Sequence, residues 1–214
     1  MNVLMLNGSP HAKGCTYTAL SEIGKVLKNE GIEYDIFNIG TKPVRDCIAC
    51  GKCREENAEG CIFKDDAVNE FVKKAEDADG FVFGSPVYYA HPSGRILSFL
   101  DRAFYCNSND HIYKAFAYKP AAAVVSARRG GTTASLDALG KYFGIAQMPA
   151  VGSTYWNMVH GNVPEEVLKD KEGLQTMRNI GHNMAWLLKC IKLGKENGIA
   201  LPDIQTEYAT NFIR

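Results

Sequence analysis

Four cysteines lie close together in the chain with a spacing that suits a metal centre. Cys47, Cys50 and Cys53 form a Cys-x2-Cys-x2-Cys run, and Cys61 follows after seven intervening residues. Four thiolates are the ligands that a [4Fe–4S] cluster requires, and the same four thiolates suit a zinc ion. The pattern predicts a candidate metal site, for which a [4Fe–4S] cluster, zinc and no metal remain three open interpretations.

The other thiols and the start of the chain bear on the redox compartment. Seven cysteines is an odd number, and Met1 leads directly into an apolar run without a basic leader. Disulfides are rare in reducing compartments, so metal or redox chemistry is a better interpretation of these thiols than a disulfide framework. We expect a cytoplasmic protein in which Cys106 and Cys190 are small core residues among apolar helical positions.

The balance of charge limits the partners. The 24 Lys and Arg residues equal the 24 Asp and Glu residues, so there is no field of one sign to gather nucleic acid or an anionic membrane. The apolar runs, such as residues 121–125, are far shorter than the ~20 residues of a membrane-spanning helix. We therefore expect no nucleic-acid partner and no membrane partner.

A glycine-flanked loop near the start of the chain suits a terminal phosphate. Residues 8–17 contain neither the Gly-x-Gly-x-x-Gly of a dinucleotide site nor a Walker A sequence. The loop instead offers the hydroxyls of Ser9 and Thr16, a cation at His11 or Lys13, and backbone N–H groups where a helix begins. These groups favour a phosphomonoester, although turn and helix-cap roles explain the same residues equally well.

Two later loops carry groups that suit a flat ring with a polar rim. Residues 85–94 place the adjacent aromatics Tyr88 and Tyr89 after a buried strand. Residues 126–132 supply two arginines and the adjacent glycines Gly130 and Gly131, which allow close backbone approach. Taken singly, each loop could also be an ordinary connection between a strand and a helix.

The elements that position these loops alternate along the chain. Short apolar runs predict strands at residues 3–6, 34–39, 81–83, 121–125 and 150–154. Apolar residues at helical spacing predict helices at 16–27, 68–75, 96–104, 136–143 and 174–191. This alternation predicts one α/β domain over residues 1–214, a doubly wound five-stranded parallel sheet with helices on both faces. Two insertions interrupt it, at about 42–64 and 155–172.

In such a fold the three loops meet, because each follows the carboxyl end of a parallel strand. This edge of the sheet is where ligands bind. Their sequences resemble those of the flavodoxin-like NAD(P)H-dependent FMN reductase family. The resemblance rests on Gly8-Ser9-Pro10 with Gly14-Cys15-Thr16, on Ser85-Pro86-Val87-Tyr88-Tyr89 with Ser93-Gly94, and on Phe99-Leu100-Asp101-Arg102. It implies strand order 2-1-3-4-5 and bound FMN. The cysteine segment resembles that of the iron–sulfur flavoproteins, a branch of the same family. Against a cluster, other flavodoxin-like sequences carry similar cysteines without holding one.

The resemblance also implies which residues bind the cofactor. Ser9, His11, Cys15, Thr16 and Tyr17 would surround the FMN phosphate, Pro86, Val87, Tyr88 and Tyr89 would line the isoalloxazine, and Ser126, Arg128, Gly130 and Gly131 would close its other edge. Two positions depart from the family pattern. His11 replaces the usual Arg and Cys15 the usual Asn, so a bidentate cation and an amide contact to phosphate are lost and affinity should fall.

The implied activity needs no side chain as a covalent nucleophile. NAD(P)H would reduce FMN, which would pass electrons to a quinone, nitro or azo compound, another flavin, a redox protein or the cluster. A one-electron carrier and a non-catalytic flavin-binding module are the alternatives. Carriers of this fold are usually acidic, which the balanced charge disfavours. The resemblance further implies a homodimer or homotetramer, as do Tyr155 and Trp156 within a long insertion.

Overall fold

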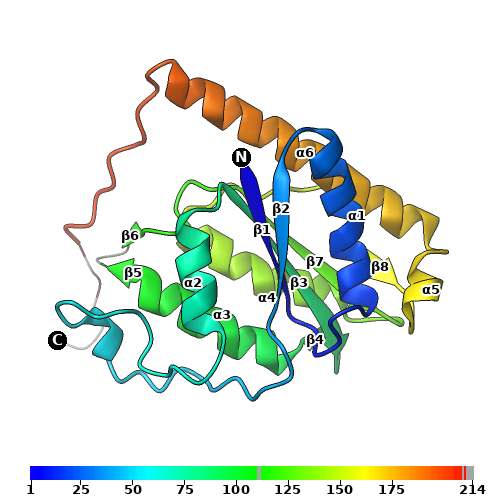
Figure 1. Cartoon of the computed structure of the whole chain (residues 1–214), viewed down its shortest axis with the longest axis horizontal. Helices are drawn as coiled ribbons and strands as arrows, with labels where there is room; N and C mark the ends of the chain where they lie inside the picture. Colours follow the sequence, from blue (N-terminus) through cyan, green and yellow to red (C-terminus); the bar gives the residue numbers. More distant parts are fainter. Residues whose placement is uncertain (110–111, 209, 211–214) are drawn as a thin grey trace.

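A central parallel sheet organises the chain (Figure 1). The computed structural model describes residues 1–109, 112–208 and 210. The sheet has the order β2-β1-β3-β7-β8, with the short β4 paired antiparallel to β3. Its strands are β1 Asn2–Asn7, β2 Glu33–Asn38, β3 Gly80–Tyr88, β4 His91–Pro92, β7 Ala121–Ala127 and β8 Met158–His160. The five parallel strands therefore follow one another in the predicted 2-1-3-4-5 order.

Helices cover both faces of the sheet. The central strands β1, β3 and β7 are buried along nearly their whole length, because the crossover helices cover both sides of the sheet. The helices are α1 Cys15–Asn29, α2 Val68–Glu76, α3 Gly94–Asn107, α4 Thr132–Ile145, α5 Pro164–Val167 and α6 Lys171–Glu196, with a 3₁₀ turn η1 Lys52–Arg54 and a small hairpin of β5 Ser108–Asn109 and β6 Ile112–Tyr113. In the described part of the chain, no helix is both long enough and apolar enough to cross a membrane.

Two hydrophobic clusters flank the sheet. Alternate strand residues point to opposite faces, so Leu4 and Leu6 join one cluster while Val3 and Met5 join the other. The first cluster is rich in phenylalanine and packs under α2, α3 and α4. The second packs under α1 and α6, which lie side by side (Figure 1). The β–α alternation predicted from the sequence is confirmed by these two layers.

The fifth strand differs from the prediction. Residues 150–154 form only a single bridge, Ala121 to Ala150, and the paired strand is β8, whose Val159 lies opposite Ser126. Between them the chain leaves the edge of β7, and the side chain of Asn157 donates to the carbonyl of Val151 at 3.4 Å. The segment 155–172, expected to be an insertion, thus supplies both β8 and α5.

The third strand is longer than predicted. The run 81–83 is only its core, because β3 continues to Tyr88, with Pro86 opposite Ser126 of β7. Strand β4 then pairs back on it through a two-residue turn in which Tyr89 and Ala90 both have positive φ, 50° and 64°. Pro86, Val87 and Tyr88 therefore lie on a strand end, which holds them more firmly than the predicted loop would.

Candidate functional site

A cavity of about 760 Å³ lies at the carboxyl ends of β1, β3 and β7. Four connections meet around it, from β1 to α1, at the end of β3, from β7 to α4, and from β8 to α5. Its lining residues are Ser9, His11, Ala12, Lys13, Gly14, Cys15, Thr16, Pro86, Val87, Tyr88, Ser126, Ala127, Arg128, Gly161, Asn162, Val163 and Pro164. Nine of the predicted cofactor-binding residues are among them, so the structure brings the predicted loops together.

The first loop is held in shape by Asn7, a residue that the sequence analysis missed. The side chain of Asn7 is fully buried at the end of β1. Its Oδ1 accepts from the N–H of Ser9 at 3.1 Å, and its Nδ2 donates to the carbonyls of His11 and Ala12 at 3.4 Å each. The signal was an Asn directly before Gly8 at a strand end, which is typical of a turn closed by the side chain.

The start of α1 faces this cavity without a side-chain cap. The cap residue is Gly14, and the first turn contains no acidic residue. The first N–H groups of a helix have no partner within the helix and carry partial positive charge. The backbone N–H groups at this end of α1 are therefore suited to bind an anion.

Thr16 and Ser126 join two of the loops. Both side chains are buried, and their hydroxyl oxygens lie 2.9 Å apart. The contact ties the first turn of α1 to the end of β7. Only one of the two hydroxyls can donate to the other, so the second keeps a proton free for a ligand.

The fourth wall of the cavity lies in the segment expected to be an insertion. Residues 161–164 follow β8, and the thiol of Cys15 donates to the carbonyl of Gly161 at 3.6 Å. Burial raises the pKa of the Cys15 thiol, and the nearby carboxylates Glu166 and Glu165 raise it further. Cys15 therefore stays a neutral thiol beside the helix terminus and does not compete with an anion.

Four predicted cofactor-binding residues do not line the cavity. Tyr17 lies in α1, the side chain of Tyr89 is fully exposed, and Gly130 lies on the outer part of its loop. Gly131 has a structural role, since its φ is 95° and a Cβ at this position would lie 2.3 Å from Cα of Ala90. It lets the loop after β7 approach the turn after β3.

The chemistry of the cavity fits FMN. The uncapped helix terminus shares the cavity with the basic side chains of His11, Lys13 and Arg128. Tyr88 and Val87 provide apolar surface for a flat ring. None of the lining residues is acidic, so a dianionic phosphate meets no like charge in the wall.

The cysteines border a second, much smaller cavity of about 20 Å³. It is lined by Cys47, Ile48, Cys50, Gly51, Cys53, Cys61, Ile62, Phe63, Arg102, Tyr105 and Cys106. All four predicted ligands share this space, and the donor set and its apolar cover fit a thiolate-bound centre. Among the described residues, however, no three His, Cys, Asp or Glu side chains are close enough to hold a metal ion as placed.

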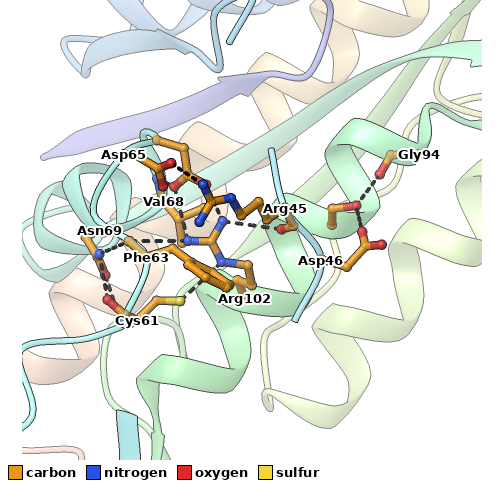
Figure 2. Close-up of polar contacts among 11 residues, drawn as sticks. Arg45, Asp46, Cys61, Phe63, Asp65, Val68, Asn69, Gly94 and Arg102 are labelled. Carbon is orange, nitrogen blue, oxygen red and sulfur yellow. Dashed lines mark hydrogen bonds and ion pairs between the residues drawn. The ribbon is translucent and has the colours of Figure 1, made fainter. Parts of the chain in front are cut away.

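Cys61 is the anchored member of the set, as Figure 2 shows. Asn69 accepts from the N–H of Cys61 at 2.8 Å and donates to its carbonyl at 2.9 Å. The sulfur accepts from Nε of Arg102 at 3.2 Å. Cys47 and Cys50 are exposed by contrast, so one ligand is fixed while the others lie on a surface segment.

Cys106 adds a fifth thiol that was predicted to be a plain core residue. Burial, with smaller contributions from the neighbouring Cys61 and Cys53, raises the pKa of this thiol to about 12. Burial is also the main reason why the pKa of Cys53 is raised. At neutral pH Cys106 is a neutral thiol beside the four predicted ligands.

Helix α3 connects the two sites. Ser93 caps its first turn, accepting from the N–H of Ile96 at 3.4 Å, and follows directly on β4. One stripe of the helix then holds the cysteine segment, because Arg95 donates to the carbonyl of Gly40 at 2.6 Å and Ser98 bonds Asp46. The next residue along this stripe is Arg102. Helix α3 therefore runs from β4, which pairs with the end of β3 at the cavity, to the cysteine segment.

Comparisons with known proteins agree with this geometry. The sequence pattern of the NADPH-dependent FMN reductase family matches residues 1–163. An iron–sulfur flavoprotein of Methanocaldococcus jannaschii is 32% identical over 197 residues, which cover 90% of this chain and 100% of that protein.

Solved structures show the same fold. RosB with bound 8-demethyl-8-formylriboflavin-5′-phosphate aligns with a TM-score of 0.67 at 14% identity, over 100% of this chain and 94% of that one. A WrbA-like flavodoxin from Agrobacterium tumefaciens aligns with a TM-score of 0.57 at 16% identity, over 88% and 96%. The fold is therefore flavodoxin-like, and the chain belongs to the NADPH-dependent FMN reductase family.

Proposed function

We propose that this protein is an FMN-dependent oxidoreductase that takes electrons from NAD(P)H and passes them to a small acceptor or to an iron–sulfur cluster on its own cysteines. The observation that carries the proposal is the cavity at the carboxyl ends of β1, β3 and β7, where an uncapped helix terminus, three basic side chains and an aromatic side chain converge. When bound, FMN supplies two-electron uptake from a nicotinamide and one- or two-electron release.

The residues divide the binding of FMN between them. The phosphate would be held by the first turn of α1, the hydroxyls of Ser9 and Thr16 and the basic side chains of His11 and Lys13. Residues 86–88 would lie along the ring, and Arg128 would place positive charge near it. The fixed hydrogen bonds of Asn7 keep these donors in place before the cofactor arrives.

The hydride donor needs access to the ring from outside. Tyr88 is 46% exposed and Tyr89 fully exposed, so the turn after β3 is an open edge of the cavity. Through an open edge, a nicotinamide and then an electron acceptor can reach the same face of the flavin in succession. NADH and NADPH differ by one phosphate, and the exposed Arg128 and Arg129 favour the phosphorylated donor.

We also propose that Cys47, Cys50, Cys53 and Cys61 hold a [4Fe–4S] cluster. The four thiols border one cavity, and the relative that is 32% identical over nearly the whole chain is named an iron–sulfur flavoprotein. Closing the four sulfurs round a cluster requires movement of the segment that carries the exposed Cys47 and Cys50, while Cys61 keeps its place.

Anaerobic stopped-flow mixing tests the reductase. Protein purified without air is mixed with NADH or NADPH, and the flavin absorbance is followed. Rapid bleaching supports the proposal. Slow bleaching with efficient reduction by dithionite would make the protein a one-electron carrier, and protein without bound flavin would make it a non-catalytic module.

The cofactors are identified in the same preparation. Mass spectrometry of the released flavin should give FMN, because the first loop serves one terminal phosphate and lacks the glycines that a pyrophosphate needs. FAD would contradict the phosphate assignment. Iron and sulfide analysis together with zinc analysis separates a cluster, zinc and an empty cysteine segment.

A further inference from the structure

Arg102 is the most conspicuous buried charge outside the flavin cavity. It lies on α3 with 1% of its surface exposed, next to the cysteine cavity. A buried guanidinium is costly unless it is paired and its donors are satisfied. Where those donors point therefore indicates what the residue is placed to do.

All five N–H groups of Arg102 have an acceptor. Nη1 donates to Asp66 and to the carbonyl of Arg45, and Nη2 donates to Asp66 at 3.2 Å and to the carbonyl of Phe63 at 3.4 Å. Nε donates to Sγ of Cys61 at 3.2 Å. Figure 2 shows Cys61, Phe63 and Arg45 gathered round this side chain.

The sulfur is the unusual acceptor among the five. A neutral thiol is a weak acceptor, whereas a thiolate forms a charge-assisted hydrogen bond with a guanidinium. The four other N–H groups point to carboxylate or carbonyl oxygens. Of the five hydrogen bonds, only the one from Nε therefore becomes stronger when the sulfur of Cys61 is anionic, as it is in a metal centre.

The surroundings fix Cys61 from two directions. Asn69 holds its backbone on both sides, and Arg102 holds its sulfur. The counter-charge, Asp66, is also buried, with 3% of its side chain exposed. The field of Arg102 at the sulfur is therefore partly cancelled, and the N–H to sulfur hydrogen bond remains.

We propose that Arg102 is a positioning residue for Cys61, which fixes the sulfur of this ligand and raises the reduction potential of the iron–sulfur centre, while Asp66 limits that rise. The inference rests on the cluster in the proposed function. Hydrogen bonds to cluster sulfurs and nearby positive charge favour the reduced, more negative state, and these are the protein's main means of setting the potential.

A purely structural role makes a different prediction. If Arg102 only filled space and joined α3 to the cysteine segment, changing either partner of the ion pair would lower the amount of cluster without shifting its potential. If the proposal holds, the two partners act in opposite senses. Losing the hydrogen bond should lower the potential, and losing the counter-charge should raise it.

The experiment compares wild type with Arg102→Lys, Asp66→Asn and the control Arg45→Lys, each reconstituted anaerobically with iron and sulfide. Arg102→Lys keeps the positive charge but removes the fork that reaches both Asp66 and the sulfur. Both arginines lie over the Phe63 ring, Arg102 at 5.0 Å and Arg45 at 4.8 Å, but the Arg45 guanidinium is exposed and pairs with Asp65 at 2.7 Å. Midpoint potentials are read by EPR-monitored titration, with FMN content and flavin potential in the same samples.

The expected result is a more negative cluster potential in Arg102→Lys, a more positive one in Asp66→Asn, and no change in Arg45→Lys. Shifts in the same direction, or unchanged potentials in the cluster that remains, would overturn the proposal. If Arg102→Lys does not fold, Asp66→Asn alone must still show the positive shift.

The proposed reductase activity is judged separately. FMN reduction by NAD(P)H can fail while the cluster potentials shift as expected, which leaves the role of Arg102 standing. A wild-type protein that reduces FMN but assembles no cluster would overturn this inference together with the proposed cluster, and would leave the proposed reductase activity standing.

Discussion

At the scale of single residues, the hydroxyls of Thr16 and Ser126 act as one unit. They lie 2.9 Å apart and both are buried, although they come from different loops. A ligand phosphate that accepts from one hydroxyl is therefore coupled to the other. Removing either one should disturb the same hydrogen-bonded chain.

We expect Thr16→Ala and Ser126→Ala each to weaken FMN binding by about 1–3 kcal/mol, the range for a hydrogen bond to a charged group. The double variant should lose less than the sum, because the two residues share one interaction. Titration of the apoprotein with FMN measures all three. Thr18→Ala is the matched control, since its hydroxyl bonds only the carbonyl of Gly14 at 3.2 Å and does not line the cavity. Unchanged affinity in Thr16→Ala would make Thr16 an ordinary helix residue.

A variant of Cys106 tests whether every thiol that borders the cysteine cavity is a metal ligand. It borders the same cavity as the other cysteines, but its pKa of about 12 keeps it protonated, and a ligand must be a thiolate. We expect Cys106→Ala to keep the full iron content after anaerobic reconstitution, and Cys53→Ala to lose most of it. Iron lost equally from both variants would make Cys106 a fifth ligand.

At the scale of elements, the turn after β3 and the start of α4 are fitted to each other. Gly131 precedes α4 with φ of 95°, and it sits against Ala90, which has φ of 64° in the turn. Each position needs an uncommon backbone conformation, and strain of this kind persists only where the surroundings enforce it. The two connections therefore set the width of the cavity jointly.

Gly131→Ala should lower the free energy of unfolding by roughly 1–3 kcal/mol and weaken FMN binding as well, because a Cβ would push outward the turn of Tyr89 and Ala90, which directly follows Tyr88. Gly130→Ala is the control, because a Cβ at this position would meet no atom within 4 Å and φ is not positive. Its stability should change by less than about 0.5 kcal/mol. Urea unfolding and FMN titration of both variants decide, and equal effects would rule out the packing explanation.

The elements themselves were largely predictable because their burial is periodic. The run 3–6 and the helical spacing from Thr16 to Leu27 have direct counterparts in β1 and α1. The strand β8 was missed, since its three residues show no alternation and owe their place to pairing with β7. Asn7 was missed for a similar reason, because its partners exist only once the loop has folded.

Contacts distant in sequence could not be read from local pattern. Arg102 was recognised as part of a family motif, yet its partner Cys61 lies 41 residues away and is reached only across the packed face of α3. The wall at 161–164 likewise joins the cavity only because β8 ends beside β7. Periodicity specifies which face of an element is buried, but it does not specify which distant residue lies opposite.

At the scale of the whole molecule, the outer side of the sheet carries uncovered apolar surface. The segment between the Ala150 bridge and β8 borders an apolar cavity of about 610 Å³ against α4, with Tyr155 57% exposed and Trp156 61% exposed. Two adjacent exposed aromatics of this kind are typical of interface anchors. The segment leads directly through β8 into the wall of the flavin cavity.

We expect the protein to be a homodimer or homotetramer with this segment at a subunit interface beside the FMN site. Burying Trp156 in such an interface removes apolar surface from water. The neighbouring subunit then also limits access of water and oxygen to the flavin. Trp156→Ala should dissociate the oligomer and lower turnover together. The matched control is Trp186→Ala, whose tryptophan is similarly exposed at 68% but lies on α6, which covers the other face of the sheet. Light scattering coupled to gel filtration, with activity measured on the same fractions, gives mass and turnover. A fully active monomer at micromolar concentration would contradict the expectation, and dissociation by Trp186→Ala instead of Trp156→Ala would move the interface to α6.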